Sequence, residues 1–165
     1  MIYAFDTEFI DDGAQFQLVS IGVARDDGGT LYVESLEVDW MLADSWVIEH
    51  VRPQLEGNAI PRAEMRERLV EFIGDDTPTF FAYYAPSDWV NLFRLFGTLL
   101  DLPSGWPRLC FDLKQWQVAL GMPALPPDPA GAHKAIDDAV WNLEVYRLLA
   151  ALDPTGAERM RTLRS

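Results

Sequence analysis

Cysteine, positive charge and long apolar runs are all scarce in this 165-residue chain. Its one cysteine, Cys110, cannot form an internal disulfide and lacks the cysteine and histidine neighbours of a zinc site, so we expect a small buried hydrophobic residue. No window approaches ~20 uninterrupted apolar residues, and no basic segment precedes an apolar stretch at the N-terminus. We therefore expect a cytoplasmic protein with neither a membrane span nor an export signal.

The shortage of positive charge limits the partners that the chain can bind. Its 13 Lys and Arg oppose 26 Asp and Glu, for a formal net charge of −13. Broad electrostatic binding to duplex nucleic acid is not expected with this balance. An enzyme that holds only a strand end through divalent ions is still compatible with it, because such ions supply positive charge where phosphate oxygens need it.

What the chain does contain is apolar: 49% of residues are hydrophobic, with six Trp and nine Phe. This is enough for one sizeable core and little for two, so a single domain over residues 1–165 is expected. Strands are predicted at 2–9, 17–25, 30–38, 78–84 and 109–111. Helices are predicted at 45–51, from Pro61, near Trp89, after 111 and in a final long segment, with a basic tail behind it. This order favours an α/β fold with a mixed sheet and helices on its faces.

Two details of the last third of the chain can be tested against a structure. A loop rich in Pro and Gly is predicted at 121–132, where we expect mobility. The final helix is predicted to bury Ile136, Val140, Leu143, Tyr146 and Ala150.

Two acids interrupt the apolar first strand, where the sequence reads YAFDTEF. Side chains two residues apart in a strand point to the same face, so Asp6 and Glu8 should lie within roughly 7 Å and repel each other. This stretch alone leaves two explanations open: a solvated strand end, or a divalent cation shared by both carboxylates.

Two further acids fall at helix starts. Asp88 is predicted in the first turn of the helix that follows the strand at 78–84, and Asp138 in the first turn of the final helix. Ends of neighbouring elements can converge in a mixed sheet, so these acids could share one pocket with Asp6 and Glu8.

These residues resemble the three motifs of the DEDD exonucleases: DTE at 6–8, an Asp at a strand-to-helix junction, and HKAIDD at 133–138. Lys134 stands where the tyrosine branch has Tyr, so the histidine branch, DEDDh, is implied. DTEFIDDG, VSIGV, SWVIEHVRPQL and HKAIDDA extend the resemblance to the ribonuclease AS group of bacterial exoribonucleases over nearly the whole chain. Tyr84 and Ser87 depart from it, because many members have Asn and an aromatic residue there.

The resemblance implies a ribonuclease H-like fold with a mixed five-stranded sheet. It implies 3′-to-5′ hydrolysis of single-stranded RNA, with a preference for adenylate, to 5′-mononucleotides, and a homodimer of the kind that related exonucleases often form. It also implies two Mg²⁺ ions per active site, for which Mn²⁺ could substitute. The alternatives are a 3′-to-5′ exonuclease acting on single-stranded DNA or short oligonucleotides and, in another class, a catalytically silent nucleic-acid-binding protein.

The same resemblance implies roles for the acids. Asp6 would bridge both ions, Glu8 and Asp138 would bind the ion beside the attacking water, and Asp88 would act directly or through water. The family spacing selects Asp138 as the ligand over its neighbour Asp137, which is expected to be solvated.

The chain has two histidines, and only one has the setting of a catalytic base. His133 stands five residues before Asp138 at the end of the Pro/Gly-rich loop. Its side chain has an unperturbed pKa of ~6.5, which suits proton transfer near neutral pH, and it is assigned as general base. His50 is expected to be an ordinary structural or surface residue.

Substrate contacts are predicted from residue type and position. Bases of a single strand stack on aromatic rings, and Phe9 and Trp89 are the rings nearest to the acids in sequence, although both could equally be core residues. Lys114, Lys134 and the arginines at 62–68 are candidates for phosphate contacts, with solvated surface positions as the alternative.

Overall fold

The computed structural model describes residues 1–129 and 133–163, and a five-stranded mixed sheet runs through its centre. The strands are β1 (Ile2–Asp11), β2 (Phe16–Arg25), β3 (Thr30–Glu34), β4 (Thr79–Ala82) and β5 (Phe111–Asp112). Their order is β3-β2-β1-β4-β5, with β1 antiparallel to β2 and parallel to β4. The expected α/β fold is confirmed, and β1 is its central strand.

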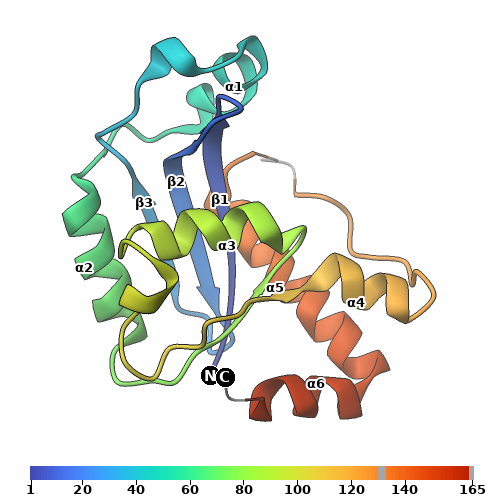
Figure 1. Ribbon diagram of the computed structural model, residues 1–165. Coiled ribbons are helices and arrows are strands. Elements are labelled where there is room, and N and C mark those ends of the chain that lie inside the picture. The colour runs from blue at the N-terminus through green and yellow to red at the C-terminus, as the bar shows by residue number, and fades with distance from the viewer. Residues whose placement is uncertain (130–132, 164–165) are drawn as a thin grey trace.

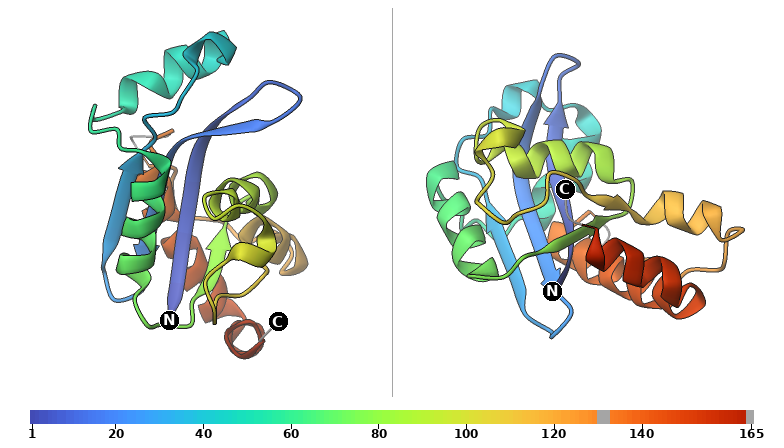
Figure 2. Two further views of the ribbon diagram at one scale, coloured as in Figure 1. Left: turned by 60° about the vertical axis from the view of Figure 1, so that its left-hand side comes forward. Right: turned by 60° about the horizontal axis from the view of Figure 1, so that its bottom comes forward.

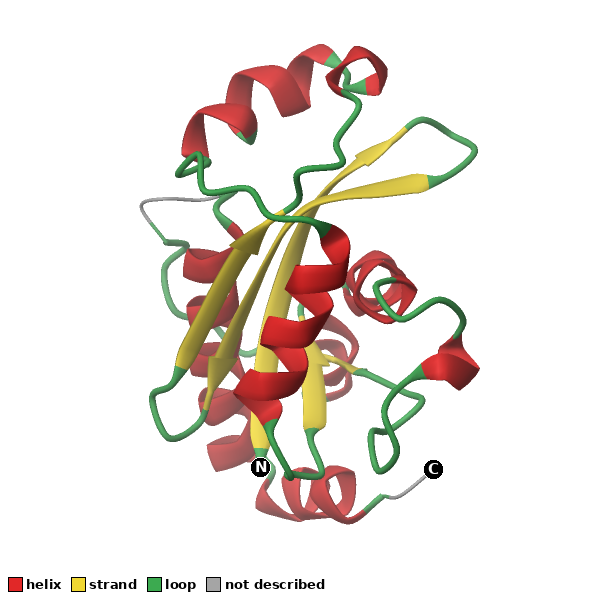
Figure 3. Ribbon diagram, turned by 90° about the vertical axis from the view of Figure 1, so that its left-hand side faces the viewer, coloured by secondary structure: helices red, strands yellow, loops and turns green. Residues whose placement is uncertain are grey.

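Helices cover both faces of this sheet (Figures 1 and 3). They are α1 (Ser45–His50), α2 (Arg62–Ile73), α3 (Ala85–Arg94), α4 (Leu113–Ala119), α5 (Ala135–Leu152) and α6 (Pro154–Thr162). Short 3-10 turns lie at η1 (Trp40–Leu42), η2 (Arg52–Gln54) and η3 (Leu99–Asp101). Helices α2 and α3 pack on one face, and α5 packs on the other.

The alternation of β1 assigns its side chains to these two layers. Tyr3 and Phe5 belong to the core cluster under α2 and α3, whereas Ile2 and Ala4 belong to the cluster under α5. Continuing the alternation, Asp6 and Glu8 fall on the α5 face and Thr7 on the α3 face. The layer in which each functional side chain lies is therefore decided by strand periodicity.

The β1–β2 hairpin projects beyond the rest of the sheet, and the segment from η1 to η2 lies next to it (Figure 2). A small separate core joins the two, formed by Ile10, Val19, Val47 and Val51. The Asp44 carboxylate starts α1 by accepting from the Val47 amide at 2.9 Å. This core holds α1 against the β1–β2 hairpin.

Two expectations about local structure were wrong. The third strand ends at Glu34 rather than 38, because the Leu36 amide bonds to Ile60 instead of continuing along β2. Val140 is 39% exposed, since the buried face of α5 is centred on Ala139, Leu143 and Tyr146. The basic tail contains the helix α6, whose first turn is capped by Asp153.

Of the predicted loop at 121–132, the segment 121–129 contains no helix or strand, and 130–132 lie outside the described residues. No helix in the described part of the chain is long and apolar enough to cross a membrane.

Candidate active site

Asp6 and Glu8 stand on β1 opposite Gly22 and Ser20 of β2. The strand before them is fully buried from Tyr3 to Phe5, so their backbone is held rigidly. The pairing register shifts between Glu8 and Phe9, at a bulge that ends the regular alternation directly after the second acid. Both carboxylates thus project from a fixed strand toward α5.

Gly22 allows α5 to approach these acids. A Cβ atom at this position would lie only 2.2 Å from the Ala135 carbonyl oxygen, so any other residue would push the first turn of α5 away from the sheet. One turn beyond Asp138, the buried Asn142 amide donates to the Phe5 carbonyl at 2.9 Å. These two contacts fasten α5 to β1 beside Asp6.

This close approach brings Asp138 to the two strand acids. Oxygen atoms of Asp6, Glu8 and Asp138 all lie within 4.8 Å of one another. Asp137, one residue earlier, is not part of this group. The three carboxylates offer the oxygen ligands that hard divalent cations prefer, and a cation would relieve their mutual repulsion. The donor set therefore fits a divalent metal ion.

Asp88 lies beside this triad rather than within it. It is 6% exposed in the first turn of α3, and its Oδ1 accepts from the Thr7 hydroxyl at 2.6 Å and from the Thr7 amide at 3.1 Å. Because Thr7 points to the α3 face, these bonds keep Asp88 at the edge of the triad. Its charge still raises the pKa of both Asp6 and Glu8.

Burial and crowding favour the protonated forms of these acids. Burial raises the pKa of Glu8 to about 8, with further contributions from the charges of Asp138 and Asp88. Burial also raises the pKa of Asp88 to about 7, against the opposing effect of the Thr7 hydrogen bonds. The pKa of Asp6 is raised well above its usual range by burial and then by its three acidic neighbours. The cluster thus lacks enough compensating positive charge of its own.

His133 lies at the edge of the same cluster. Its backbone amide donates to Asp138 Oδ2 at 2.9 Å, and its φ of 71° is in the left-handed region that side chains rarely adopt. That amide bond opposes the effect of burial, which raises the pKa of Asp138. The proposed base and one proposed ligand are therefore tied together by a direct contact.

Two rings of α1 lie near the His133 ring, and one of them, Trp46, was not predicted as a site residue. Trp46 of α1 packs edge-on against it with 4.7 Å between ring centroids, and Trp46 stacks on His50 at 4.9 Å. His50 Nδ1 lies 2.9 Å from the Trp46 carbonyl oxygen. The spacing of four residues places both rings on one side of a helix, a signal that was present in the sequence. His50 is exposed, as expected of a surface residue, and its ring centre lies 6.3 Å from that of His133.

The segment next to His133 is held by a network around Glu34. Lys134 Nζ lies 2.6 Å from Glu56 Oε1 and 5.4 Å from the centre of the Tyr32 ring. The Glu34 carboxylate accepts hydrogen bonds from the backbone amides of Glu56, Gly57 and Asn58 at 2.5 to 3.2 Å. Lys134 is thus an anchor for the start of α5, paired with a carboxylate.

The two aromatic candidates differ in their surroundings. Phe9 is half-buried and pairs with Phe16 across the hairpin, with 5.0 Å between ring centroids. Trp89 packs against Phe80 at 5.7 Å and against Phe5 at 6.4 Å, on the core side of α3. These contacts show that Trp89 packs against the core, which was one of the two roles that the sequence left open.

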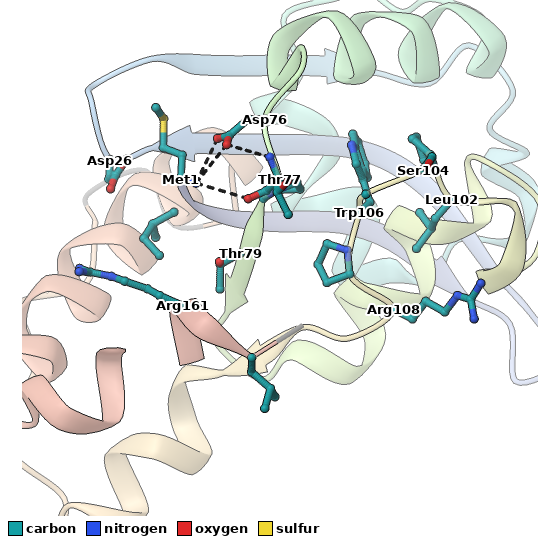
Figure 4. Close-up of a pocket in the computed structure, with 16 residues that line it drawn as sticks. Met1, Asp26, Asp76, Thr77, Thr79, Leu102, Ser104, Trp106, Arg108 and Arg161 are labelled. Atoms are coloured by element: carbon teal, nitrogen blue, oxygen red, sulfur yellow. Dashed lines mark hydrogen bonds and ion pairs between the residues drawn. The ribbon is translucent and has the colours of Figure 1, made fainter. Parts of the chain in front are cut away.

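A cavity of about 960 Å³ lies elsewhere, at the start of β1, and its lining includes Met1, Asp76, Trp106 and Arg161 (Figure 4). None of the triad acids lines it. Met1 directly precedes β1 there, whereas Asp6 and Glu8 stand further along the strand toward its other end. The cavity is therefore separate from the acid site.

No protein-family model matches the chain. Two curated proteins do: each is named a 3′-5′ exoribonuclease, one from Mycobacterium tuberculosis strain CDC 1551 / Oshkosh and one from strain ATCC 25618 / H37Rv. Each is 38% identical over 163 residues, a match that covers 94% of this chain and 97% of the relative. This chain belongs to their 3′-5′ exoribonuclease family. The expectation of an enzyme of this class is confirmed.

Solved structures agree on the fold. A structure of exonuclease I superposes with a TM-score of 0.69 at 12% identity, over 98% of this chain and 43% of that one. The zinc-bound complex of E. coli exonuclease I with single-stranded DNA has a TM-score of 0.66 at 11% identity, over 93% of this chain and 41% of that one. The chain spans less than half of each exonuclease I chain. These likenesses confirm the ribonuclease H-like fold.

Proposed function

We propose that this chain is a metal-dependent exoribonuclease of the DEDDh type, in the ribonuclease AS group, which acts as a single domain over residues 1–165. It hydrolyses single-stranded RNA from the 3′ end and releases 5′-mononucleotides. The observation that carries this proposal is the convergence of Asp6, Glu8 and Asp138 within 4.8 Å, with His133 bonded to Asp138. Family membership supplies the reaction class, and this cluster supplies the groups that the reaction needs.

The triad acids are proposed as ligands for two Mg²⁺ ions, with Mn²⁺ able to substitute. Asp88 would join directly or through water, in keeping with its place at the edge of the triad. The chemistry that such ions supply when bound is a lower pKa for water and neutralised charge on phosphate oxygens. Few basic residues are needed around such a site, which suits a chain of net charge −13.

His133 is proposed as the general base that takes the proton of the attacking water. Its amide bond to Asp138 holds its backbone, and the edge-on contact with Trp46 restricts its ring. We therefore propose Trp46 as a positioning residue that acts through His133. Phe9, half-buried beside the acids, is proposed to stack on the terminal base, whereas Trp89 has less support because it packs on the core.

The function is tested with end-labelled strands of equal length: oligoadenylate, mixed-sequence RNA and single-stranded DNA, each with Mg²⁺ or with EDTA. We expect Mg²⁺-dependent release of 5′-mononucleotides from RNA, fastest from oligoadenylate. Release from DNA at an equal rate would favour the alternative of a DNA exonuclease, and a 5′-end label released first would contradict the polarity. No metal-dependent release from any strand would refute the proposal.

Replacing His133 separates the base from the ligands. His133→Ala should lower kcat by about 10²- to 10⁴-fold, the usual contribution of a general base, while Mg²⁺ still stabilises the protein against heat. Trp46→Ala should lower kcat by a smaller factor and alter the pH–rate profile with it, whereas Trp46→Phe should restore most of the rate. An unchanged kcat in His133→Ala would refute the base assignment.

The remaining proposals concern the cellular location and the oligomeric state of the enzyme. An RNA substrate is consistent with a cytoplasmic location, and related exonucleases are often homodimers. Sedimentation at micromolar concentration tests the second point directly.

A further inference from the structure

An aromatic cluster lies about one helical turn from the acids. The Tyr83 ring packs edge-on against Tyr84, with 4.9 Å between centroids, and against Trp141 at 5.1 Å. Tyr84 stands four residues before Asp88, and Trp141 stands three residues after Asp138. At 1.5 Å per helical residue, Trp141 is about 4.5 Å from Asp138 along α5, and Tyr84 directly precedes α3, whose first turn holds Asp88. The cluster therefore borders the proposed active site.

Two of the three rings are locked in place. The Tyr83 hydroxyl donates to Gln117 Oε1 at 3.1 Å, and Gln117 Nε2 in turn donates to the Pro123 carbonyl at 2.9 Å. Trp141 Nε1 donates to the Pro126 carbonyl at 3.2 Å. These bonds tie the cluster to the segment after α4, so it offers a rigid support to whatever packs on it.

Tyr84 is the member that faces solvent. It is 63% exposed, and its φ of 58° lies in the left-handed region, which is costly for a bulky side chain. Asn or Gly would adopt this backbone with less strain. An exposed ring at a strained position gains little from burial in the free protein. Its presence is therefore better explained by a ligand that covers the ring.

A cation stands against these rings. Lys114 Nζ lies 5.6 Å from the centre of the Tyr83 ring and 5.9 Å from that of Tyr84, and donates to Gln117 Oε1 at 3.1 Å. Lys134 is paired with Glu56 and Arg68 with Glu64, whereas Lys114 takes part in none of the ion pairs of the described residues. Because Lys114 has no carboxylate partner among the described residues, its ammonium group is available to bind a phosphate of the substrate.

We propose that Tyr84 and Lys114 form a binding platform for a nucleotide upstream of the 3′-terminal one, with its base on the Tyr84 ring and its phosphate at Lys114. The inference rests on the proposed function, because it assigns a further subsite to the same enzyme. A ring and a cation side by side match the repeating base and phosphate of a single strand, and stacking accepts any base. The platform would favour strands over single nucleotides.

Binding without turnover tests the platform independently of catalysis. The probe is a 5′-fluorescein oligoadenylate 12-mer, followed by anisotropy in EDTA. Tyr84→Asn keeps a residue that tolerates the left-handed backbone but removes the ring, and should weaken binding about tenfold, whereas Tyr84→Phe should bind within about twofold of the parent. Leu100→Asn is a matched control, because Leu100 is 70% exposed in η3 and its loss should leave binding unchanged.

The role of the Lys114 charge is tested by the salt dependence of 12-mer binding. Lys114→Gln should reduce the slope of log Kd against log salt by about 0.7, the value for one phosphate contact on a single strand, and Lys114→Arg should retain it. In Mg²⁺, the loss of kcat/KM in Tyr84→Asn should be about tenfold larger for the 12-mer than for the p-nitrophenyl ester of adenosine monophosphate, which has no upstream nucleotide.

The outcomes separate this inference from the proposed function. If the parent protein hydrolyses neither substrate, the proposed function fails, while the anisotropy series still measures the platform. Equal 12-mer affinity in the parent and Tyr84→Asn would overturn the platform whatever the activity. Equal losses on the 12-mer and the ester would also overturn it, since that pattern indicates general damage to the site.

Discussion

Glu8 and Glu34 stand in one row of the sheet, because Ser20 of β2 pairs with Glu8 on one side and Glu34 on the other. Glu34 is 2% exposed and is surrounded by donors: the Tyr32 hydroxyl at 2.9 Å and three backbone amides at 56–58. Glu8, two strands away, faces the carboxylates of Asp6 and Asp138 instead.

The difference teaches how environment assigns a role to a carboxylate. An acid supplied with N–H and O–H donors is satisfied inside the protein and holds a loop in place. A carboxylate surrounded by other carboxylates is repelled by their negative charges, and a cation bound from solution relieves this repulsion. The same residue type therefore serves structure at Glu34 and is proposed to serve chemistry at Glu8.

Removing one charge from the acid cluster should have the largest effect on rate. Asp6→Asn should lower the rate of mononucleotide release by on the order of 10³-fold, because the proposed ligand set is broken. The metal-free protein should unfold at an equal or higher urea concentration, since repulsion is relieved. Asp137→Asn, outside the triad, is the control and should retain the rate within about twofold. A near-normal rate in Asp6→Asn would remove this residue from the site.

Moving α5 away from β1 should have the next largest effect. Gly22→Ala places a methyl group against the Ala135 carbonyl, so Asp138 must shift, and a displacement of about 1 Å can cost about 10²-fold in kcat. Gly29→Ala is the matched control, because its Cβ would meet only the flexible end of Arg25. Rate assays and circular dichroism separate displacement from unfolding. Equal rates in both variants would show that the approach at Gly22 is not required.

Glu34→Gln sharpens the comparison from the structural side. It replaces an acceptor oxygen by a donor facing backbone amides, and should lower the free energy of unfolding by about 1–3 kcal/mol. The rate per folded molecule should change far less than in Asp6→Asn. Exposed Glu49→Gln serves as the control. Urea denaturation measures the difference, and a loss no larger than in Glu49→Gln would contradict the structural role.

The pH dependence of stability should reveal the crowded acids. The pKa of Glu8 is raised from 4.5 to about 8, so the folded state binds more protons than the unfolded state between these values. The metal-free protein should therefore lose stability as pH rises through this window. Thermal unfolding from pH 4.5 to 8 measures the trend, and Mg²⁺ should stabilise most at the upper end. A flat profile would refute the crowding, and a profile that matches Glu8→Gln would show that Glu8 does not contribute to it.

Local pattern was enough to predict most elements and the identity of the acids. The alternation of YAFDTEF places Asp6 and Glu8 on one face, and apolar spacing places Asp88 and Asp138 in first turns. Such patterns depend on near neighbours in the chain, which is why they can be read from a sequence. The end of β3 and the exposure of Val140 were not predicted, because Ile60 and the tight packing at Gly22 decide them from a distance.

The sequence by itself determined the central strand, its two acids, the helix-start positions of Asp88 and Asp138, and the resemblance that names the reaction class. Only the tertiary structure decided which carboxylates are satisfied and which are crowded, because the amide donors to Glu34 come from a loop 22 to 24 residues later. It also decided that Trp46 meets His133 and that Tyr84 meets Lys114. Hydrogen bonds and ring contacts join residues that are distant in sequence, and their partners are set only when the layers pack.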